Sequence, residues 1–295
     1  FFAYVGFDAV ATAAEEAENP KRDLPIGILA SLSISTILYV LVTAVLTMMI
    51  PYYLIDNNSP LAAAFAYYDL GWAQILVAFG AFAALTTSIL GNLLSQPRIF
   101  FSMARDGLLF GWFAEIHPKF HTPMNATLTT GAASALLALL LDIETLADMV
   151  SIGTLLAFTI VCSAVLTIRY SSEKRPYQSV AMITAFIISI SIAAFLLVFG
   201  VHWIFWTTFF GIAIVPAALL FTQETVDLPE SFATPLVPLV PLLGITFNIF
   251  MMANLGYATW IRLVVWLILG VLFYFIYSIR NSKLAETDEQ DATTE

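Results

Sequence analysis

The segment that decides the fold is LPIGILASLSISTILYVLVTAVLTMMI, residues 24–50, which contains no charged side chain. An α-helix needs about 20 mostly apolar residues to cross the hydrocarbon core of a bilayer, and residues 24–50 exceed that length. The segment has no strict apolar–polar alternation of the kind that marks a membrane β-strand. A chain in lipid must satisfy its backbone hydrogen bonds internally, so the segment predicts a transmembrane helix.

The rest of the chain has the same character. It is 60% hydrophobic and 11% charged, with a mean hydropathy of +0.89, whereas soluble domains are about half apolar and about a quarter charged. Long apolar stretches recur between charged or turn-rich breaks, near residues 1–14, 24–50, 71–97, 122–141, 149–168, 178–200, 203–222, 234–253 and 257–279. We therefore predict an all-α, polytopic helical membrane protein with about nine transmembrane helices.

The order of the basic residues predicts the topology. Ten of the eleven Lys and Arg residues fall in alternate loops on one side, and only Arg262 is out of pattern, near enough to a helix end to snorkel. The opposite loops carry Asp and Glu without basic residues. The positive-inside rule then makes the first loop and the C-terminus cytoplasmic. The acidic residues 281–295 predict a solvated tail.

Cysteine and histidine usage points away from metal chemistry. The single cysteine, Cys162, lies inside a predicted span, which excludes a disulfide framework and a thiolate metal site. His117 and His121 have the i, i+4 spacing of a metal pair, but Pro118 disrupts a helix there and no further Cys or His is near. We expect no metal, no cofactor, no nucleic-acid partner and no obligate partner subunit. The chain opens at Phe1 inside an apolar segment, and we interpret it as a fragment that lacks upstream spans.

The first candidate site is FAYVGFD, residues 2–8. Asp8 stands within a predicted span, where a carboxylate costs roughly 2.5–3.5 kcal/mol and usually faces a cavity or pathway. Gly6 beside it tolerates a helix interruption, and interrupted helices expose backbone groups to solutes at mid-membrane depth in many transporters. The alternative is that Asp8 lies nearer the outer surface and is simply solvated.

The second candidate site is a polar stripe within residues 71–97. Ser88, Asn92 and Ser95 are spaced i, i+4 and i+7, so they share one face of an otherwise apolar helix. Such a face can line a cavity that hydrogen-bonds a polar ligand. The alternative is close helix packing, which small polar residues also favour in membranes.

Two further features lie in predicted loops. Asn57-Asn58-Ser59 is a glycosylation sequon in an external loop, so Asn57 is a candidate acceptor if the source is eukaryotic. Residues 98–123 combine Arg, Lys and aromatic side chains and predict an amphipathic interfacial segment at the inner membrane face.

At these residues the sequence resembles the cationic amino acid transporters, a branch of the amino acid, polyamine and organocation superfamily. The resemblance is strong over about residues 1–170 and weaker beyond. Its most specific parts are Gly6-Phe7-Asp8 with Glu15-Glu16 and Asn19-Pro20, Pro97-Arg98 with Asp106-Gly107-Leu108-Leu109-Phe110, and Ser151-Ile152-Gly153-Thr154 with Arg169-Tyr170.

The resemblance implies a leucine-transporter-type fold. Members of the family have fourteen spans, and the nine predicted here resemble the sixth to the fourteenth. Residues 1–170 would then be the second five-helix repeat, 171–280 four accessory helices and 281–295 the cytoplasmic tail. The first five helices of the same protein, which form the first repeat, would be missing.

The resemblance also implies roles for residues. Phe2 looks like the aromatic gate over the substrate, and Ala3 and Val5 look like contacts around its amino group and side chain, beside Gly6. Asp8 resembles a carboxylate that pairs with a lysine on the fifth helix. Related sodium-coupled carriers place ion ligands at the positions of Thr87 and Ser88, which makes these two a candidate ion or helix-contact site. Ser88 and Asn92 are candidates for the wall that admits a long cationic side chain.

The leading functional hypothesis is sodium-independent, voltage-driven transport of arginine, lysine or ornithine by alternating access, in the plasma membrane. A proton-coupled carrier of neutral or broad-range amino acids is the nearest alternative. An intramembrane enzyme would need paired Asp residues, a Ser-His pair or a His-rich metal site in adjacent spans, and the sequence shows one mid-span acid and no mid-span His. We therefore predict that the protein is not an enzyme. A truncated, nontransporting membrane subunit is a further alternative.

Overall fold

The computed structural model describes residues 2–7, 9–12, 17–56, 59–170, 176–223 and 233–283. Within these ranges the regular structure is entirely helical, which confirms the all-α prediction. The chain forms two compact units, one of Ala3–Leu137 with Phe273–Glu295 and the other of Phe1–Phe2 with Ala138–Leu272. We call them the α4 unit and the α7 unit and describe each by itself.

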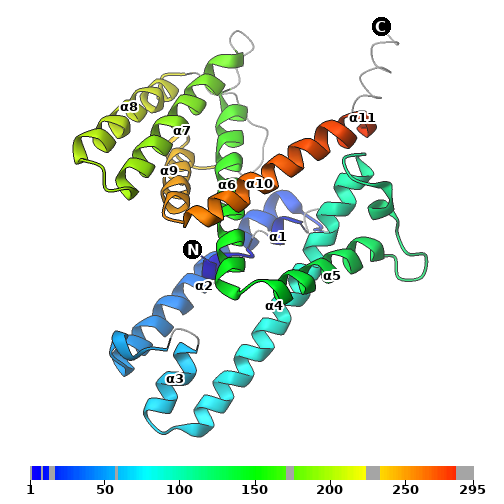
Figure 1. Ribbon diagram of the computed structural model, residues 1–295, viewed down its shortest axis with the longest axis vertical. Helices are drawn as coiled ribbons and strands as arrows, with labels where there is room; N and C mark the ends of the chain where they lie inside the picture. Colours follow the sequence, from blue (N-terminus) through cyan, green and yellow to red (C-terminus); the bar gives the residue numbers. More distant parts are fainter. Residues whose placement is uncertain are drawn as a thin grey trace. The chain divides into compact units, whose positions relative to one another are not determined.

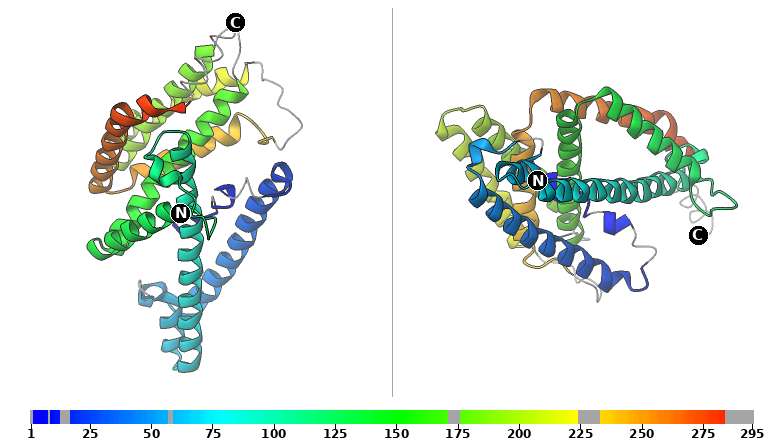
Figure 2. Two further views of the ribbon diagram at one scale, coloured as in Figure 1. Left: turned by 90° about the vertical axis from the view of Figure 1, so that its right-hand side faces the viewer. Right: turned by 90° about the horizontal axis from the view of Figure 1, so that it is seen from below.

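The α4 unit is built around two long helices, α2 and α4. Its helices are α1 (Ala9–Thr12), α2 (Pro20–Met49), η3 (Tyr52–Leu54), α3 (Pro60–Tyr67), α4 (Gly71–Arg105), η4 (Gly111–Ala114), most of α5 (Met124–Leu140), η5 (Tyr274–Ser278) and α11 (Ile279–Asn281). The short α3 packs against both α2 and α4 at the end where they converge (Figures 1 and 2). Towards their other ends α2 and α4 diverge, and α1 contacts both of them (Figure 2).

A C-terminal clamp joins residues 273–283 to the loop that follows α4. Ser278 Oγ donates a hydrogen bond of 2.8 Å to the Leu108 carbonyl, and the Lys283 N–H donates one of 3.2 Å to the Asp106 carbonyl. The ring centroids of Phe110 and Tyr277 lie 4.8 Å apart. Gly107 has a φ of +81°, and a Cβ there would overlap the Asn281 carbonyl oxygen, so the contact depends on glycine.

The α7 unit contains the apolar core of the second half of the chain. Its helices are α6 (Ile143–Arg169), α7 (Pro176–Val198), α8 (Trp203–Phe221), α9 (Leu239–Ala253) and α10 (Tyr257–Phe273, whose last residue falls in the α4 unit). Helices α7 and α8 lie side by side (Figure 1), and α9 packs against α6 and α7. Leu166, Leu220 and Ile245 are completely buried where these helices meet. A Cβ at Gly244 would lie 3.0 Å from Cys162 Sγ, so small residues bring α9 close to α6.

Polar contacts cap the start of α6 and join α10 to both α6 and α9. Asp142 caps the first turn, because its carboxylate accepts a 3.1 Å hydrogen bond from the Thr145 backbone N–H, and this bond lowers the pKa of Asp142 below its usual 3.8. Further along, the fully buried Thr259 of α10 donates to Asp148 of α6 at 3.1 Å. Trp260 of α10 donates to the Met252 carbonyl of α9.

The nine predicted apolar segments fall into three kinds. In the described ranges six helices are long and apolar enough to cross a membrane, namely α2, α4, α6, α7, α8 and α10 with its extension to Asn281. Helices α5 and α9 are also apolar but shorter, at 17 and 15 residues. The first segment is broken rather than continuous. The chain is an integral, multi-pass membrane protein.

Several predicted boundaries were wrong. Helix α4 does not end at Pro97 but continues to Arg105, so it takes up the start of the predicted interfacial segment, and α6 begins at Ile143 rather than near residue 149. Helix α3 was not predicted. The two units divide the chain after Leu137, whereas the predicted division at residue 171 separates a repeat from accessory helices. That division and the inverted repeat stay predictions.

Candidate substrate site at a broken helix

The first apolar segment is interrupted at Gly6, as the sequence predicted. Phe2–Tyr4 forms one 3₁₀ turn, residues 5–7 turn without regular helix, and α1 begins at Ala9. Gly6 has a φ of +117°, a conformation that side chains disfavour, and this redirects the backbone. Asp8, the predicted carboxylate, lies outside the described residues, as do Glu15 and Glu16.

Tyr39 of α2 contacts the broken segment. Its hydroxyl donates a hydrogen bond of 2.9 Å to the Ala3 carbonyl, and its ring meets that of Tyr4 edge to face, with centroids 5.3 Å apart. The middle of the uncharged stretch 24–50 is residue 37, only about 3 Å of helix axis from Tyr39. Ala3 therefore lies at the mid-depth of this apolar helix, not near its outer end.

A second contact gives the direction of the broken segment. A Cβ placed on Gly27 of α2 would lie 3.7 Å from the Val10 side chain of α1. Gly27 and Tyr39 are separated by about 18 Å of helix axis, whereas seven helical residues, the distance from Ala3 to Val10, cover only about 10 Å. The segment runs towards the Pro20 end of α2, the end that the sequence predicts to be cytoplasmic. A chain with an unwound segment covers the about 18 Å between the levels of Tyr39 and Gly27 better than a continuous helix of seven residues does.

The polar stripe lies on α4 in the same unit. The Ser88 and Asn92 side chains are exposed and make no hydrogen bond with any described residue. Thr87, by contrast, donates to the Ala83 carbonyl of its own helix at 2.9 Å. Polar groups at membrane depth require partners, so Ser88 and Asn92 are available to a ligand or to protein outside the described ranges. The role of Thr87 in ion binding stays a prediction.

The α4 unit brings most of the predicted site residues into one compact body. Ala3, Val5 and Gly6 precede α1, which contacts the helix that carries Ser88 and Asn92 (Figure 2). The side chain of Phe2 and the sequon residue Asn57 lie outside what the structure describes. Sequence reasoning missed Tyr39, although a tyrosine at mid-span carries a hydroxyl that must find a partner in lipid.

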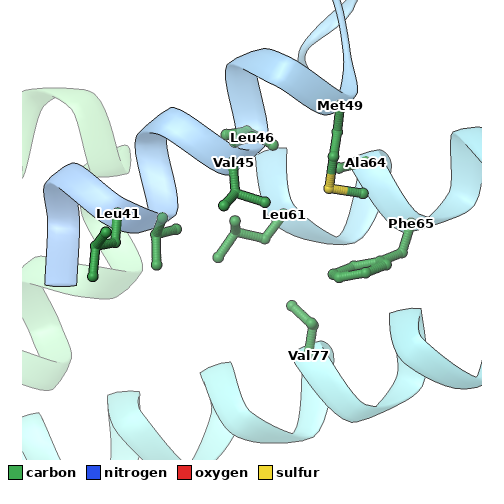
Figure 3. Close-up of a pocket in the computed structure, with 9 residues that line it drawn as sticks. Leu41, Val45, Leu46, Met49, Leu61, Ala64, Phe65 and Val77 are labelled. Carbon is green, nitrogen blue, oxygen red and sulfur yellow. The ribbon is translucent and has the colours of Figure 1, made fainter.

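A cavity of about 330 Å³ lies elsewhere in the α4 unit, between α2, α3 and α4 (Figure 3). Figure 3 shows the side chains of its walls pointing toward one another. All are apolar: Leu41, Val42, Val45, Leu46, Met49, Leu61, Ala64, Phe65 and Val77. An amino acid zwitterion would find no hydrogen-bond partner there. This cavity is therefore a poorer candidate for an amino acid site than the broken segment.

The His117 side chain has a structural role in its loop. His117 Nδ1 accepts hydrogen bonds from the backbone N–H groups of Lys119 and Phe120, at 3.2 and 3.4 Å, which closes the loop before α5. In the ranges that the structure describes, no three His, Cys, Asp or Glu residues are grouped as a metal site requires.

Comparison with known proteins identifies the family. The family profile described as Amino acid permease matches residues 1–226, and the profile described as the C-terminus of AA_permease matches residues 232–282. Amino acid permeases are transport proteins rather than enzymes.

Curated relatives are similar along nearly the whole chain. Cationic amino acid transporter 3, mitochondrial, of Arabidopsis thaliana is 35% identical over 353 residues, covering 96% of this chain and 57% of the relative. Cationic amino acid transporter 4 of Homo sapiens is 34% identical, with coverages of 96% and 55%. The branched-chain amino acid permease BcaP of Bacillus subtilis is 36% identical over 285 residues, with coverages of 96% and 50%. The chain thus spans about half the length of the curated relatives it matches. These findings confirm the resemblance drawn from the motifs, and the chain belongs to the amino acid permease family.

Proposed function

We propose that the protein carries cationic amino acids such as arginine, lysine and ornithine across a membrane by sodium-independent, voltage-driven alternating access. The observation that carries the proposal is the helix break at Gly6, held at the mid-depth of α2 by Tyr39. Interrupted helices at that depth present main-chain carbonyls to the ammonium group of a solute. Relatives named as cationic amino acid transporters support the choice of substrate.

The proposed site divides the recognition of the substrate between two elements. The broken segment Ala3–Gly6 supplies backbone groups for the amino group and carboxylate that all amino acids share. The exposed amide and hydroxyl of Asn92 and Ser88 on α4 hydrogen-bond the cationic side chain. Asp8 stabilises positive charge near the break, in a pair with a lysine that the family resemblance places on another helix.

The membrane potential is a sufficient driving force for such a substrate. Moving one elementary charge through 100 mV is worth about 2.3 kcal/mol, which corresponds to about 50-fold accumulation at equilibrium. No covalent step or coupled ion is then needed.

Vesicles containing the intact protein test the proposal. A potassium diffusion potential, negative inside, is imposed in sodium-free buffer, and uptake of labelled arginine is compared with uptake at zero potential. We expect accumulation that grows with the imposed voltage. Arginine uptake that is indifferent to voltage contradicts the voltage-driven mechanism, and absence of uptake of any amino acid contradicts the transport function.

A proton-coupled carrier of neutral amino acids is the second candidate. Alignment with the branched-chain permease BcaP covers 285 residues, whereas alignments with the plant and human transporters run over 353 and 350, more than the 295 residues of this chain, and therefore contain long gaps. The bacterial relative thus matches the chain more continuously than these two transporters do, although cationic amino acid transporter 9 of Arabidopsis thaliana also aligns over only 304 residues. In the same vesicles, uptake of leucine or alanine driven by a pH step, without voltage-driven arginine uptake, supports this alternative.

Location and topology are part of the proposal. We place the C-terminus in the cytoplasm on the distribution of the basic residues, and we propose the plasma membrane as the compartment. Relatives are named for vacuoles and mitochondria as well, so fluorescence microscopy of the tagged intact protein decides the compartment. The proposal also includes the family's first repeat, which would complete the site opposite α4.

A further inference from the structure

We propose that the apolar cavity between α2, α3 and α4 binds the acyl chain of a membrane lipid, from the leaflet that surrounds the Met49 end of α2. The cavity has a volume of about 330 Å³ and lies within the α4 unit (Figure 3). The proposal needs only the membrane location of the chain and is independent of the substrate that the protein carries. Four properties of the cavity point to this occupant: its depth, the aromatic residues next to it, its walls and its size.

The cavity lies at the depth of one leaflet. Residue 37 is the middle of the uncharged stretch 24–50, and the cavity-lining residues of α2 run from Leu41 to Met49. These residues lie about 6 to 18 Å from the middle along the helix axis. Each leaflet contributes about 15 Å of hydrocarbon to a bilayer. The cavity therefore meets acyl chains rather than water or headgroups along most of its length.

Aromatic residues mark the headgroup level at the Met49 end of α2. Tyr and Trp rings, which are apolar with one polar end, are enriched where a bilayer meets water. Five such side chains, each at least half exposed, follow α2, end α3 and begin α4: Tyr52, Tyr53, Tyr67, Tyr68 and Trp72. The Tyr68 hydroxyl donates a hydrogen bond of 2.8 Å to the carbonyl of Met49, a cavity-lining residue. Lipids whose headgroups lie among these rings therefore have their acyl chains at the level of the cavity.

The walls of the cavity suit hydrocarbon alone. All nine lining side chains are apolar, and a water molecule needs about two to four polar partners, so water is not a stable occupant. An apolar cavity of about 150 Å³ can hold benzene, so this one has room for roughly twice as much hydrocarbon. The side chains of Leu41, Val42 and Val45 are exposed, whereas Ala64 is only 1% exposed. A chain from the bilayer can therefore enter beside α2 and contact Ala64 at the inner wall.

The cavity is too small for another helix. The stretch from Leu41 to Met49 is about 12 Å long, and a helix about 10 Å across occupies about 900 Å³ over that length, nearly three times the volume of the cavity. Close helix contacts in membranes also favour small residues, whereas eight of the nine lining residues are Leu, Val, Met or Phe. A flexible acyl chain conforms to such walls. The competing occupant is a side chain from elsewhere in the intact protein, and the experiment distinguishes the two.

Photolabelling of the intact protein tests the assignment. The protein is reconstituted in phosphatidylcholine that carries a diazirine in one acyl chain, exchanged into detergent to remove loosely held lipid, irradiated, and mapped by peptide mass spectrometry. Ala64→Leu fills the inner wall of the cavity. Ala66→Leu is the matched control, because it makes the same change in α3 at an exposed residue that does not line the cavity. Leu61→Trp is a second filling variant, at an exposed lining residue where a larger side chain is tolerated.

In the parent protein we expect label on residues 42–49 and little on residues 36–40, which are exposed on α2 outside the cavity. Both filling variants should lower the label on residues 42–49 at least about fivefold, because they occupy the space that the acyl chain needs. Ala66→Leu should leave that label within about twofold. Phosphatidylglycerol with the same reactive chain should label residues 42–49 as strongly as phosphatidylcholine, because the cavity has no polar side chain to select a headgroup.

A parent protein without label on residues 42–49 overturns the proposal and indicates that a side chain of the intact protein occupies the cavity. Equal labelling of the parent and of a folded filling variant, or labelling by only one of the two lipids, overturns it as well. If neither filling variant folds, the parent decides: label on residues 42–49 that survives detergent exchange while label on residues 36–40 is lost supports the site, and loss of both overturns it. Because no step measures uptake, the outcome is separate from that of the transport proposal.

Discussion

Substituting Gly107 by alanine tests the C-terminal clamp, in which residues 273–283 lie against the loop after α4. The new Cβ would overlap the Asn281 carbonyl oxygen and lie 2.8 Å from the carbonyl carbon. Both atoms belong to the backbone, so no side-chain rotation relieves the overlap. In addition, a φ of +81° costs alanine about 1 kcal/mol more than glycine.

The overlap is relieved only if the clamp opens. Opening breaks the bond from Ser278 to Leu108 and the bond from Lys283 to Asp106, each worth about 1 kcal/mol. It also separates Phe110 from Tyr277, which contributes about 1 kcal/mol. The clamp contacts therefore amount to about 3 kcal/mol and the full destabilisation to about 4 kcal/mol. A 3 kcal/mol loss corresponds to roughly 100-fold easier local opening.

Amide hydrogen exchange of residues 273–283 in the intact, detergent-solubilised protein measures this opening. We expect strongly accelerated exchange in Gly107→Ala and a smaller acceleration in Ser278→Ala, which loses one hydrogen bond. Gly111→Ala is the matched control, because nothing lies within 4 Å of its added Cβ and its φ is not positive. Exchange in Gly107→Ala that equals the parent refutes the clamp.

Three other predictions concern packing, the polar stripe and a helix cap. Gly244→Ala places a Cβ 3.0 Å from Cys162 Sγ and should destabilise the protein by about 1–3 kcal/mol in thermal unfolding. Combining Gly244→Ala with Cys162→Ala removes the sulfur and should recover most of that stability. If the double variant recovers none, this contact is not the cause. Ser88→Ala and Asn92→Ala should each lower kcat/KM for arginine uptake about five- to tenfold. The melting temperature should change little, because neither side chain makes a hydrogen bond with a described residue. A lower melting temperature with normal uptake would instead favour the packing role. The Thr145 N–H lowers the pKa of Asp142 in the folded protein, so the stability contributed by the ionised Asp142 cap is complete above the unfolded-state pKa near 4 and is lost as the pH falls through the lower folded-state pKa. Asp142→Asn still caps the helix but does not ionise, so it should remove this part of the acid dependence of the melting temperature. An unchanged acid dependence would exclude the cap as its source.

The transmembrane segments were predictable because length and apolarity are properties of local sequence. Their ends were less so. Pro97 and Arg98 suggested that α4 stops at the membrane surface, but Pro97 is buried inside a helix that continues to Arg105. Membrane helices tolerate such a proline because neighbouring groups satisfy the freed carbonyl. Pro60 at the first position of α3 was an available helix signal that was not used.

The site was predictable only in part. Gly6 beside Asp8 in an apolar segment indicated an interruption, and the backbone of Gly6 agrees. The partner of the broken segment could not be read from the sequence, because the bond between Tyr39 and Ala3 depends on how α2 returns past the break. A long-range contact of this kind leaves no periodicity. Its only trace is a tyrosine at mid-span.

Cysteine labelling at the break tests the central claim most directly. The single cysteine of the chain is replaced as Cys162→Ala, and Val5→Cys is introduced at the break, with Leu38→Cys at a similar depth on α2 as the control. We predict that Val5→Cys reacts with a membrane-impermeant thiol reagent, that arginine protects it, and that Leu38→Cys does not react. A Val5→Cys protein that stays unreactive from both sides of the membrane, or that arginine fails to protect, contradicts a substrate pathway at the broken helix.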